Sequence, residues 1–261
     1  MSLAAFEHAG MQGIRLTRKK QFIKGVPRMT STHAKENYWV FRNVDAEISP
    51  GQVMAMLSRD PERTGAAMRA WARLLPLDEG AMTAPPRATL VATPQGRWLK
   101  ELSVEQTIRV IAGLYGMTDA EVDEMVPAVA RTAHVDSMMH WPIDNVQKGY
   151  RAQIAFAVGV HAPTDLVMFD YTAFVGNHDF RPLCLNHLRS MREAGKAIVI
   201  ATNKPQLVLE VATDAVILKG KRSEQVSVAQ AAEFLISDRV KNRRKARRRA
   251  QEDDDDGGLD F

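Results

Sequence analysis

Residues 53–75 read VMAMLSRDPERTGAAMRAWARLL. The apolar run at 53–57 has the length and composition of a buried strand. From Thr64 to Leu75 the apolar side chains recur at helical spacing, so this segment predicts a helix. Residues 58–65 therefore form the junction between a strand and a helix, the unit from which layered α/β folds are built.

The same alternation continues along the chain. Short apolar runs predict further strands at 88–91, 166–169, 197–201 and 215–218. Helical patterns predict helices at 104–115, 119–133, 180–194 and 204–211. Ser103 and Gln106 have the spacing of a capping box at the start of the first of these helices. Strands that alternate with helices predict a mainly parallel sheet flanked by helices.

The composition is that of an ordinary globular protein, with 45% hydrophobic and 25% charged residues. No stretch approaches the roughly 18 apolar residues of a membrane span, and residues 1–13 lack the apolar centre of a secretory signal. The single cysteine, Cys184, has no partner for an intrachain disulfide and lies in a helical pattern, so it is expected to be buried. These features predict a cytoplasmic location.

The positive charge is concentrated at the two ends of the chain. Between His8 and Lys35 every formal charge is positive, and a second basic block occupies 239–249. Such blocks suit an anionic partner such as lipid headgroups. The second block has no interleaved aromatic residues for base stacking, so it does not favour nucleic acid as the partner.

These patterns divide the chain into three regions. Residues 1–35 are basic and weakly patterned, and we expect a flexible extension that leads into the first strand. Residues 36–236 are expected to form the folded domain, with a helical subdomain at about 97–160. Residues 237–261 form a charged tail that is expected to be flexible, because its like charges are densely spaced.

Several segments resemble the nucleotide-binding domain of ABC transporters. The stretch YWVFRNVDAEISPG at 38–51 resembles the lead-in to the phosphate-loop strand of that family, and LVMFD at 166–170 resembles its Walker B strand. Further similar segments, in the family's order, are LYG at 114–116, AFVGN at 173–177 and the strand with its switch segment at 197–203. Over residues 36–220 the chain is most similar to the ATP-binding subunits of capsule and O-antigen exporters, the ABC-2 type of polysaccharide export.

This resemblance implies a fold and a set of partners. The implied fold is a P-loop NTPase-like ABC nucleotide-binding domain, with a mainly parallel sheet flanked by helices, a helical subdomain and a small antiparallel β portion. The implied cofactor is ATP with Mg²⁺. The implied partners are a multi-span membrane permease and either a second copy or an intact ATPase subunit, at the inner face of the cell membrane.

The phosphate loop departs from the family pattern. In that loop, glycines let backbone N–H groups turn toward the phosphates, a lysine reaches them and a hydroxyl holds Mg²⁺. Ser58, Pro61 and Arg63 take the glycine positions here. Thr64 stands in the lysine position and Gly65 in the position of the hydroxyl residue.

Two further features of this loop oppose phosphate binding. Pro61 lacks an N–H donor, and Glu62 adds a negative charge where phosphates would lie. At about 4 Å and an effective dielectric constant near 20, one like-charge contact costs roughly 4 kcal/mol before screening. Arg59 and Arg63 offset part of this cost, so the sequence predicts weak ATP binding at best.

The residues expected to act on ATP are also replaced. Asp170 remains as the candidate Mg²⁺ ligand, with a structural strand-end carboxylate as the alternative. Tyr171 takes the position of the glutamate that polarises water, and a phenol with a pKa near 10 is a poor base. Asn203 takes the position of the switch histidine.

The remaining nucleotide motifs are weaker still. The signature loop reads QKGY at 147–150, in which Gly149 alone matches the family. Leu99 aligns with the Q-loop glutamine, and Phe22 is a candidate for the aromatic residue that stacks on adenine.

Three functions remain open at this point. The first is an exporter subunit that is impaired or inactive in ATP hydrolysis, a pseudo-ATPase that docks to a permease through its helical subdomain. The alternative is a non-enzymatic scaffold or regulator that uses the fold to bind a membrane surface or a polyanion. The third is an active ATPase in which Arg59 or Arg63 replaces the lysine charge.

Overall fold

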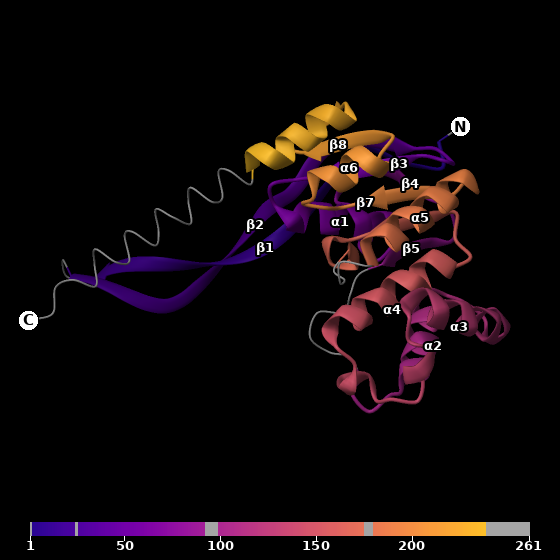
Figure 1. Cartoon of the computed structure of the whole chain (residues 1–261). Coiled ribbons are helices and arrows are strands. Elements are labelled where there is room, and N and C mark those ends of the chain that lie inside the picture. The colour runs from indigo at the N-terminus through magenta and orange to yellow at the C-terminus, as the bar shows by residue number, and fades with distance from the viewer. Residues whose placement is uncertain (1, 24–25, 92–98, 175–179, 239–261) are drawn as a thin grey trace, which may run out of the picture.

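The structure is a computed structural model that describes residues 2–23, 26–91, 99–174 and 180–238, with the backbone alone over 16–23 and 26–34. Its named strands form two sheets (Figure 1). The larger sheet has the order β5-β6-β7-β3-β8-β9, and the smaller has the order β2-β1-β4. The strands of the larger sheet are β3 (Val53–Leu57), β5 (Ala88–Val91), β6 (Leu166–Phe169), β7 (Ala197–Ile200), β8 (Asp214–Leu218) and β9 (Ser223–Val226).

The larger sheet is parallel except for β9, which pairs antiparallel with β8. Helix α1 (Pro61–Trp71) packs with the smaller sheet on one face, where Met54 and Met56 point. Helices α5 (Phe180–Glu193) and α6 (Pro205–Val211) pack on the other face, together with a helix over 228–238. Continuous apolar strands are what a parallel sheet covered on both faces requires.

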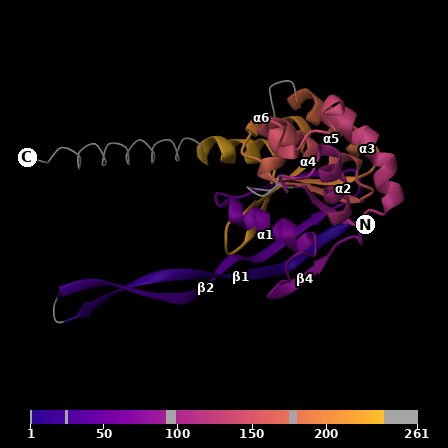
Figure 2. The same cartoon turned by 90° about the horizontal axis from the view of Figure 1, so that it is seen from below.

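The smaller sheet contains a long hairpin of β1 (Ala4–Ile23) and β2 (Val26–Ile48), with β4 (Glu79–Thr83) paired to β1. The hairpin extends well away from the body of the molecule (Figures 1 and 2). The sequence predicted a weakly patterned, flexible extension over residues 1–35, whereas the structure forms strands over 4–23 and 26–48. Backbone pairing joins the two strands from the pair Ala4–Ile48 to the pair Ile23–Val26. Backbone hydrogen bonds do not depend on side-chain type, so the hairpin leaves only a weak hydrophobic pattern in the sequence.

A helical unit of α2 (Val104–Leu114), α3 (Asp119–Ala133) and α4 (Lys148–His161) has its own apolar core. The capping box of Ser103 and Gln106 is confirmed, and Thr118 and Glu121 form a second one at the start of α3. Helix α4 was not predicted. In the described part of the chain no helix is long and apolar enough to cross a membrane.

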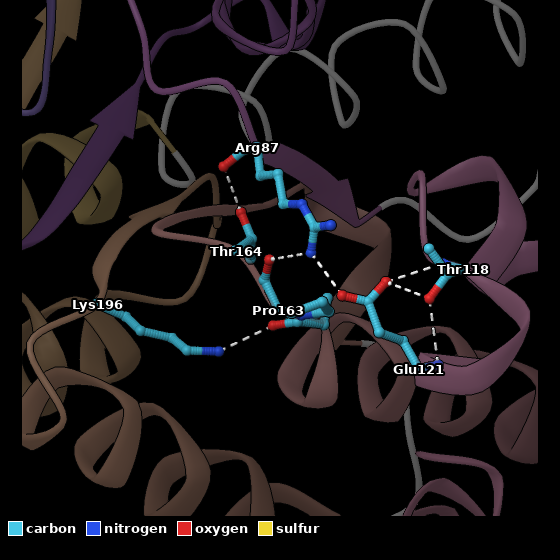
Figure 3. Close-up of polar contacts among 7 residues, drawn as sticks. Arg87, Thr118, Glu121, Pro163, Thr164 and Lys196 are labelled. Carbon is cyan, nitrogen blue, oxygen red and sulfur yellow. Dashed lines mark hydrogen bonds and ion pairs between the residues drawn. The ribbon is translucent and has the colours of Figure 1, made fainter. Parts of the chain in front are cut away.

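Polar contacts join the helical unit to the larger sheet (Figure 3). Arg87, just before β5, donates to the Glu121 carboxylate at 2.8 Å, and the Thr164 hydroxyl donates to the Arg87 carbonyl at 2.7 Å. Lys196 donates to the Ala162 carbonyl at 2.9 Å. The Arg87 guanidinium, with help from Thr118, lowers the pKa of Glu121 to about 2. These contacts tie the helical unit to the sheet at two places, just before β5 and in the connection between α4 and β6.

The helix predicted over 64–75 lies at 61–71 instead. It begins earlier because Pro61 occupies its first turn, where a missing N–H costs nothing. Strand β4 was not predicted. The other predicted helices and strands of the sheet agree with the structure to within one residue at each end.

The two glycines of α4 make a matched test of the packing between this helix and β5. A Cβ added at Gly159 would lie 2.1 Å from Val91 Cγ2, whereas a Cβ at Gly149 meets nothing within 4 Å. We expect Gly159→Ala to lower the free energy of unfolding by about 1–3 kcal/mol through overpacking. Gly149→Ala should raise it by up to about 1 kcal/mol, because alanine favours the helix. Urea denaturation of both variants checks this, and equal effects would contradict the packing.

Candidate functional site

Most of the candidate site residues meet at the carboxyl edge of the larger sheet, where β3, β6 and β7 end side by side. This is the edge at which open α/β sheets bind ligands. A cavity of about 500 Å³ lies there. It is lined by Ser58, Arg59, Pro61, Glu62, Gly65, Arg69, Asp170, Tyr171, Thr172, Thr202, Asn203, Leu235 and Asp238.

The connection from β3 to α1 is too short to wrap a phosphate. Strand β3 ends at Leu57 and α1 begins at Pro61, so only residues 58–60 lie between them. In a phosphate loop the eight-residue motif links strand to helix with its lysine near the helix start. Here the lysine position, Thr64, already lies inside the helix, so no loop remains to form a cradle.

The backbone donors that a phosphate would need already have partners within the chain. The Asp60 N–H donates to Ser58 Oγ at 3.2 Å, and the Glu62 N–H donates to Asp60 Oδ1 at 3.1 Å. The Arg63 N–H donates to the Asp60 carbonyl at 3.1 Å. Ser58 is itself fixed, because its hydroxyl donates to the Leu218 carbonyl at 3.0 Å. The Asp60 carboxylate thus caps α1 at the position where an anion would bind.

A guanidinium lies beside the position expected to hold Mg²⁺. A Cβ added at Gly65 would lie 3.3 Å from Arg69 Nη1, so Arg69 packs directly over this glycine. Thr64 is buried, and its hydroxyl donates to the Pro61 carbonyl at 3.0 Å and lies 3.5 Å from the Tyr171 hydroxyl. A positive charge at this point opposes the binding of a divalent cation.

Asp170, Tyr171 and Asn203 all line this cavity. Asp170 Oδ1 accepts the Tyr171 N–H at 2.5 Å, which holds the carboxylate against its own backbone. Burial is the main cause of a raised pKa at Tyr171, and the Asp170 carboxylate raises it further. The phenol is therefore even less ionised at neutral pH than a free tyrosine, so almost no phenolate is available to act as a base.

The two arginines of the loop have different positions. Arg59 lines the cavity, whereas Arg63 points to the other side of the loop, where its Nε donates to the Val40 carbonyl at 2.9 Å. Arg63 lines a neighbouring cavity of about 620 Å³ beside β8 and β9. Arg63 is not among the residues that line the first cavity, so it does not supply the missing lysine charge there.

Other predicted residues lie elsewhere. Gly149 is in the first turn of α4 and is not among the residues that line the cavity, and Leu99 is 60% exposed. Phe22 is in β1, where the structure describes the backbone alone. Of the AFVGN segment at 173–177, residues 175–177 lie outside the described residues, and so does the basic block at 239–249.

Sequence reasoning missed three contributors to the site. Arg69 lies one helical turn after Gly65, a spacing that could have suggested it once α1 was known to be a helix. Tyr38 donates to Glu62 Oε1 at 3.0 Å, and as an aromatic residue of the lead-in it was a visible candidate. Asp238 comes from the far end of the described chain, and no local pattern marks it.

The cavity does not fit ATP with Mg²⁺. Its walls combine Arg59 and Arg69 with the carboxylates of Glu62, Asp170 and Asp238, so it does not concentrate positive charge.

Solved structures share this architecture. A structure described as the ATP-binding subunit of an ABC transporter matches with a TM-score of 0.66, at 15% identity, over 87% of this chain and 90% of that one. The fold is that of an ABC nucleotide-binding domain. An ATP-binding cassette solved as a dimer in a post-hydrolysis state with ADP and Pi matches with a TM-score of 0.67, at 11% identity, over 86% of this chain and 98% of that one. The predicted fold class, including the small antiparallel β portion, is confirmed.

Curated relatives point to the same family. The teichoic acids export ATP-binding protein TagH of Listeria innocua is 24% identical over 200 residues, which are 76% of this chain and 59% of that protein. The protein of the same name from Shouchella clausii is 20% identical over 177 residues, 68% of this chain and 48% of that protein. The chain thus matches less than two thirds of the length of these relatives, and no protein-family model matches it. The resemblance to exporter ATP-binding subunits is confirmed.

The role of Asp60 as a helix cap can be measured. We expect Asp60→Ala to lower the free energy of unfolding by about 1 kcal/mol, because the Glu62 N–H loses its acceptor. Asp60→Asn should leave it nearly unchanged, because asparagine caps helices as well as aspartate does. Denaturant titration of the two variants checks this, and an equal loss in both would mean that the charge, not the cap, stabilises the loop.

Proposed function

We propose that this chain is an ABC-type subunit of a polysaccharide exporter that docks to a membrane permease without hydrolysing ATP. The observation that carries the proposal is the connection between β3 and α1, in which Asp60 caps the helix where a phosphate would bind. The relatives named for teichoic acid export support the process. A protein that has the fold of an enzyme without its catalytic residues serves as a binding or assembly element.

The helical unit is the proposed docking element. It carries four exposed apolar side chains, Leu99, Val110, Leu114 and Trp141. The segments of Leu99 and Trp141 lie side by side, because the Val104 N–H donates to the Trp141 carbonyl at 3.0 Å and the Leu102 N–H donates to the Leu99 carbonyl at 3.1 Å. Leu99 is 60% and Trp141 is 51% exposed, and exposed apolar side chains that gather on one unit are typical of an interaction surface.

The absence of nucleotide binding is the first expected outcome. Titration of the purified chain with Mg·ATP should give no saturable heat, with a Kd weaker than about 1 mM. Asp170→Ala is the control and should behave identically. Micromolar binding that is lost in Asp170→Ala would contradict the proposal and favour the alternative of an active nucleotide site.

Docking is tested with inside-out membrane vesicles from cells that contain the exporter. The chain should co-sediment with the vesicles, and Trp141→Ser and Leu99→Ser should each weaken this binding about tenfold, as expected for exposed anchor residues. Leu74→Ser is the matched control, because Leu74 is 64% exposed but lies outside the helical unit. Equal loss with all three variants would contradict a specific surface.

The second candidate function is a scaffold or regulator bound to a polyanion. It is favoured by the β1-β2 hairpin, which extends from the body and carries only positive formal charges from His8 to Lys35 (Figure 2). Protein-free liposomes of anionic lipid distinguish the two. Binding to these liposomes that disappears in about 0.5 M salt would support the scaffold, because salt screens surface charges. A subunit that docks to a permease should bind the membrane vesicles but not the protein-free liposomes.

A further inference from the structure

A second cavity, of about 630 Å³, lies at the base of the hairpin, on residues of all three strands of the smaller sheet. Its volume is in the range of small-molecule sites. None of the candidate nucleotide-site residues and none of the proposed docking residues lines it. Its lining consists of His8, Trp39, Arg42, Asn43, Glu79 and Lys221.

The backbone beside this cavity departs from regular β geometry. His8 has a φ of 49° and Asn43 a φ of 50°, in the left-handed region that residues other than glycine seldom adopt. The pairing of β1 with β2 shifts register on both sides of Ala9, as β-bulges require. Gly80 of β4 lets the strand approach the bulge, because a Cβ there would lie 2.4 Å from the His8 carbonyl oxygen. Bulges re-aim side chains and, like strained backbone, are concentrated beside functional sites.

The two left-handed residues meet through their side chains. His8 Nδ1 lies 3.1 Å from Asn43 Oδ1, and the His8 backbone N–H donates to Asp45 Oδ1 at 2.8 Å. An amide oxygen only accepts, so the imidazole donates this bond and the Asn43 NH₂ group is not used by it. In the described part of the chain that NH₂ group has no acceptor.

Two partners hold Arg42 in one orientation. Its Nε and Nη2 donate to the two carboxylate oxygens of Glu79 at 2.7 and 2.8 Å, and its guanidinium lies 4.5 Å from the centre of the Trp39 ring. This fork uses two of the five N–H donors of an arginine. The two protons of Nη1 and the second proton of Nη2 have no acceptor among residues 2–23, 26–91, 99–174 and 180–238. They form the end of the guanidinium, which can bind an oxyanion through two parallel bonds.

Lys221 adds a second cation from the larger sheet. It belongs to the connection between β8 and β9, and this connection is fixed to β2 by Ser223, whose hydroxyl accepts the Asp45 N–H and donates to the Asp45 carbonyl, both at 2.8 Å. Lys221 is exposed and has no carboxylate partner within the described residues, whereas Lys219 of the same connection pairs with Glu224. The lining thus carries one arginine and one lysine against a single carboxylate.

We propose that this hairpin-base cavity binds the phosphate group of a small phosphate ester. The guanidinium end of Arg42, the Lys221 ammonium and the Asn43 amide supply donors that the chain itself does not use. A phosphate ester offers several charged acceptor oxygens to such a set, and charge-assisted bonds of this kind are the strong ones. The volume leaves room for the organic group of the ester. The site is separate from the carboxyl-edge cavity and is independent of docking to a permease.

Calorimetric titration of the full chain with glucose 1-phosphate, at low salt, tests the site. Saturable binding with a Kd of about 1 mM or tighter is expected. Arg42→Lys should weaken it about tenfold, because lysine keeps the charge but not the forked donors. Asn43→Gly should weaken it about threefold, because glycine keeps the left-handed backbone and removes the amide.

Two lysine variants separate a specific site from general charge. Lys221→Gln should weaken binding about fivefold, and Lys219→Gln is the matched control, because it removes the same charge two residues away and does not line the cavity. Lys221 is exposed, so its variant keeps the test decisive even where Arg42→Lys disturbs the fold. Equal loss in the two lysine variants would overturn the site.

Vesicles of phosphatidylglycerol distinguish a lipid headgroup from a soluble ester, since both offer the same phosphate. Binding to vesicles that glucose 1-phosphate displaces, and that Lys221→Gln weakens more than Lys219→Gln does, assigns the headgroup. Binding of the soluble ester alone assigns a soluble ligand. No heat with glucose 1-phosphate at about 10 mM, together with equal vesicle binding by the two lysine variants, would overturn the proposal.

Discussion

Strand β3 lies between β7 and β8, and its five side chains are buried. Alternate residues of β3 contact the two cores, because Met54 and Met56 face α1 and the smaller sheet while Val53, Ala55 and Leu57 face α5 and α6. This two-sided burial fixes where the chain leaves the sheet. The short connection at 58–60 must therefore start at the carboxyl edge, beside the ends of β6 and β7, and every element of the site is placed relative to it.

At that edge the chain supplies its own charges where a nucleotide and a metal ion would sit. The Asp60 carboxylate receives the backbone donor at the start of α1, and Arg69 lies over Gly65. Arg59 lies near the Asp238 carboxylate. Charges of opposite sign that lie this close weaken the attraction of the site for an external anion. The burial of the sheet does not depend on the residues of the site, so the fold alone does not decide the chemistry.

The aromatic stack between Phe6 and Trp71 connects α1 to the smaller sheet. The two rings lie 4.4 Å apart and nearly parallel, and both are buried. They join β1 to the end of α1, so the base of the long hairpin belongs to the same core as the phosphate-loop helix. The helical unit has a separate core and is tied to the sheet through Arg87 and Lys196. Surfaces for partners can therefore differ between the hairpin and the helical unit without disturbing the site.

The sequence by itself determined the parallel sheet, most of its helices and which residues stand at the positions compared with the nucleotide motifs. Those features are local, because apolar periodicity marks buried strands and helices, and a missing lysine or glycine is visible at one position. The resemblance assigned Asp170, Tyr171 and Asn203 to positions of one nucleotide site, and all three line the same cavity. The β1-β2 hairpin was not predicted, because its strands pair through backbone hydrogen bonds that leave weak hydrophobic patterns.

Only the tertiary structure decided how short the loop is and what fills the site. The packing of α1 on the sheet decides three features. The helix starts at Pro61, Arg63 points away from the cavity, and Arg69 lies over Gly65. Asp238 reaches Arg59 across most of the chain's length, and such a contact is set by the path of the whole backbone. No local pattern encodes a meeting of that kind, because its energy comes from groups that are adjacent only after folding.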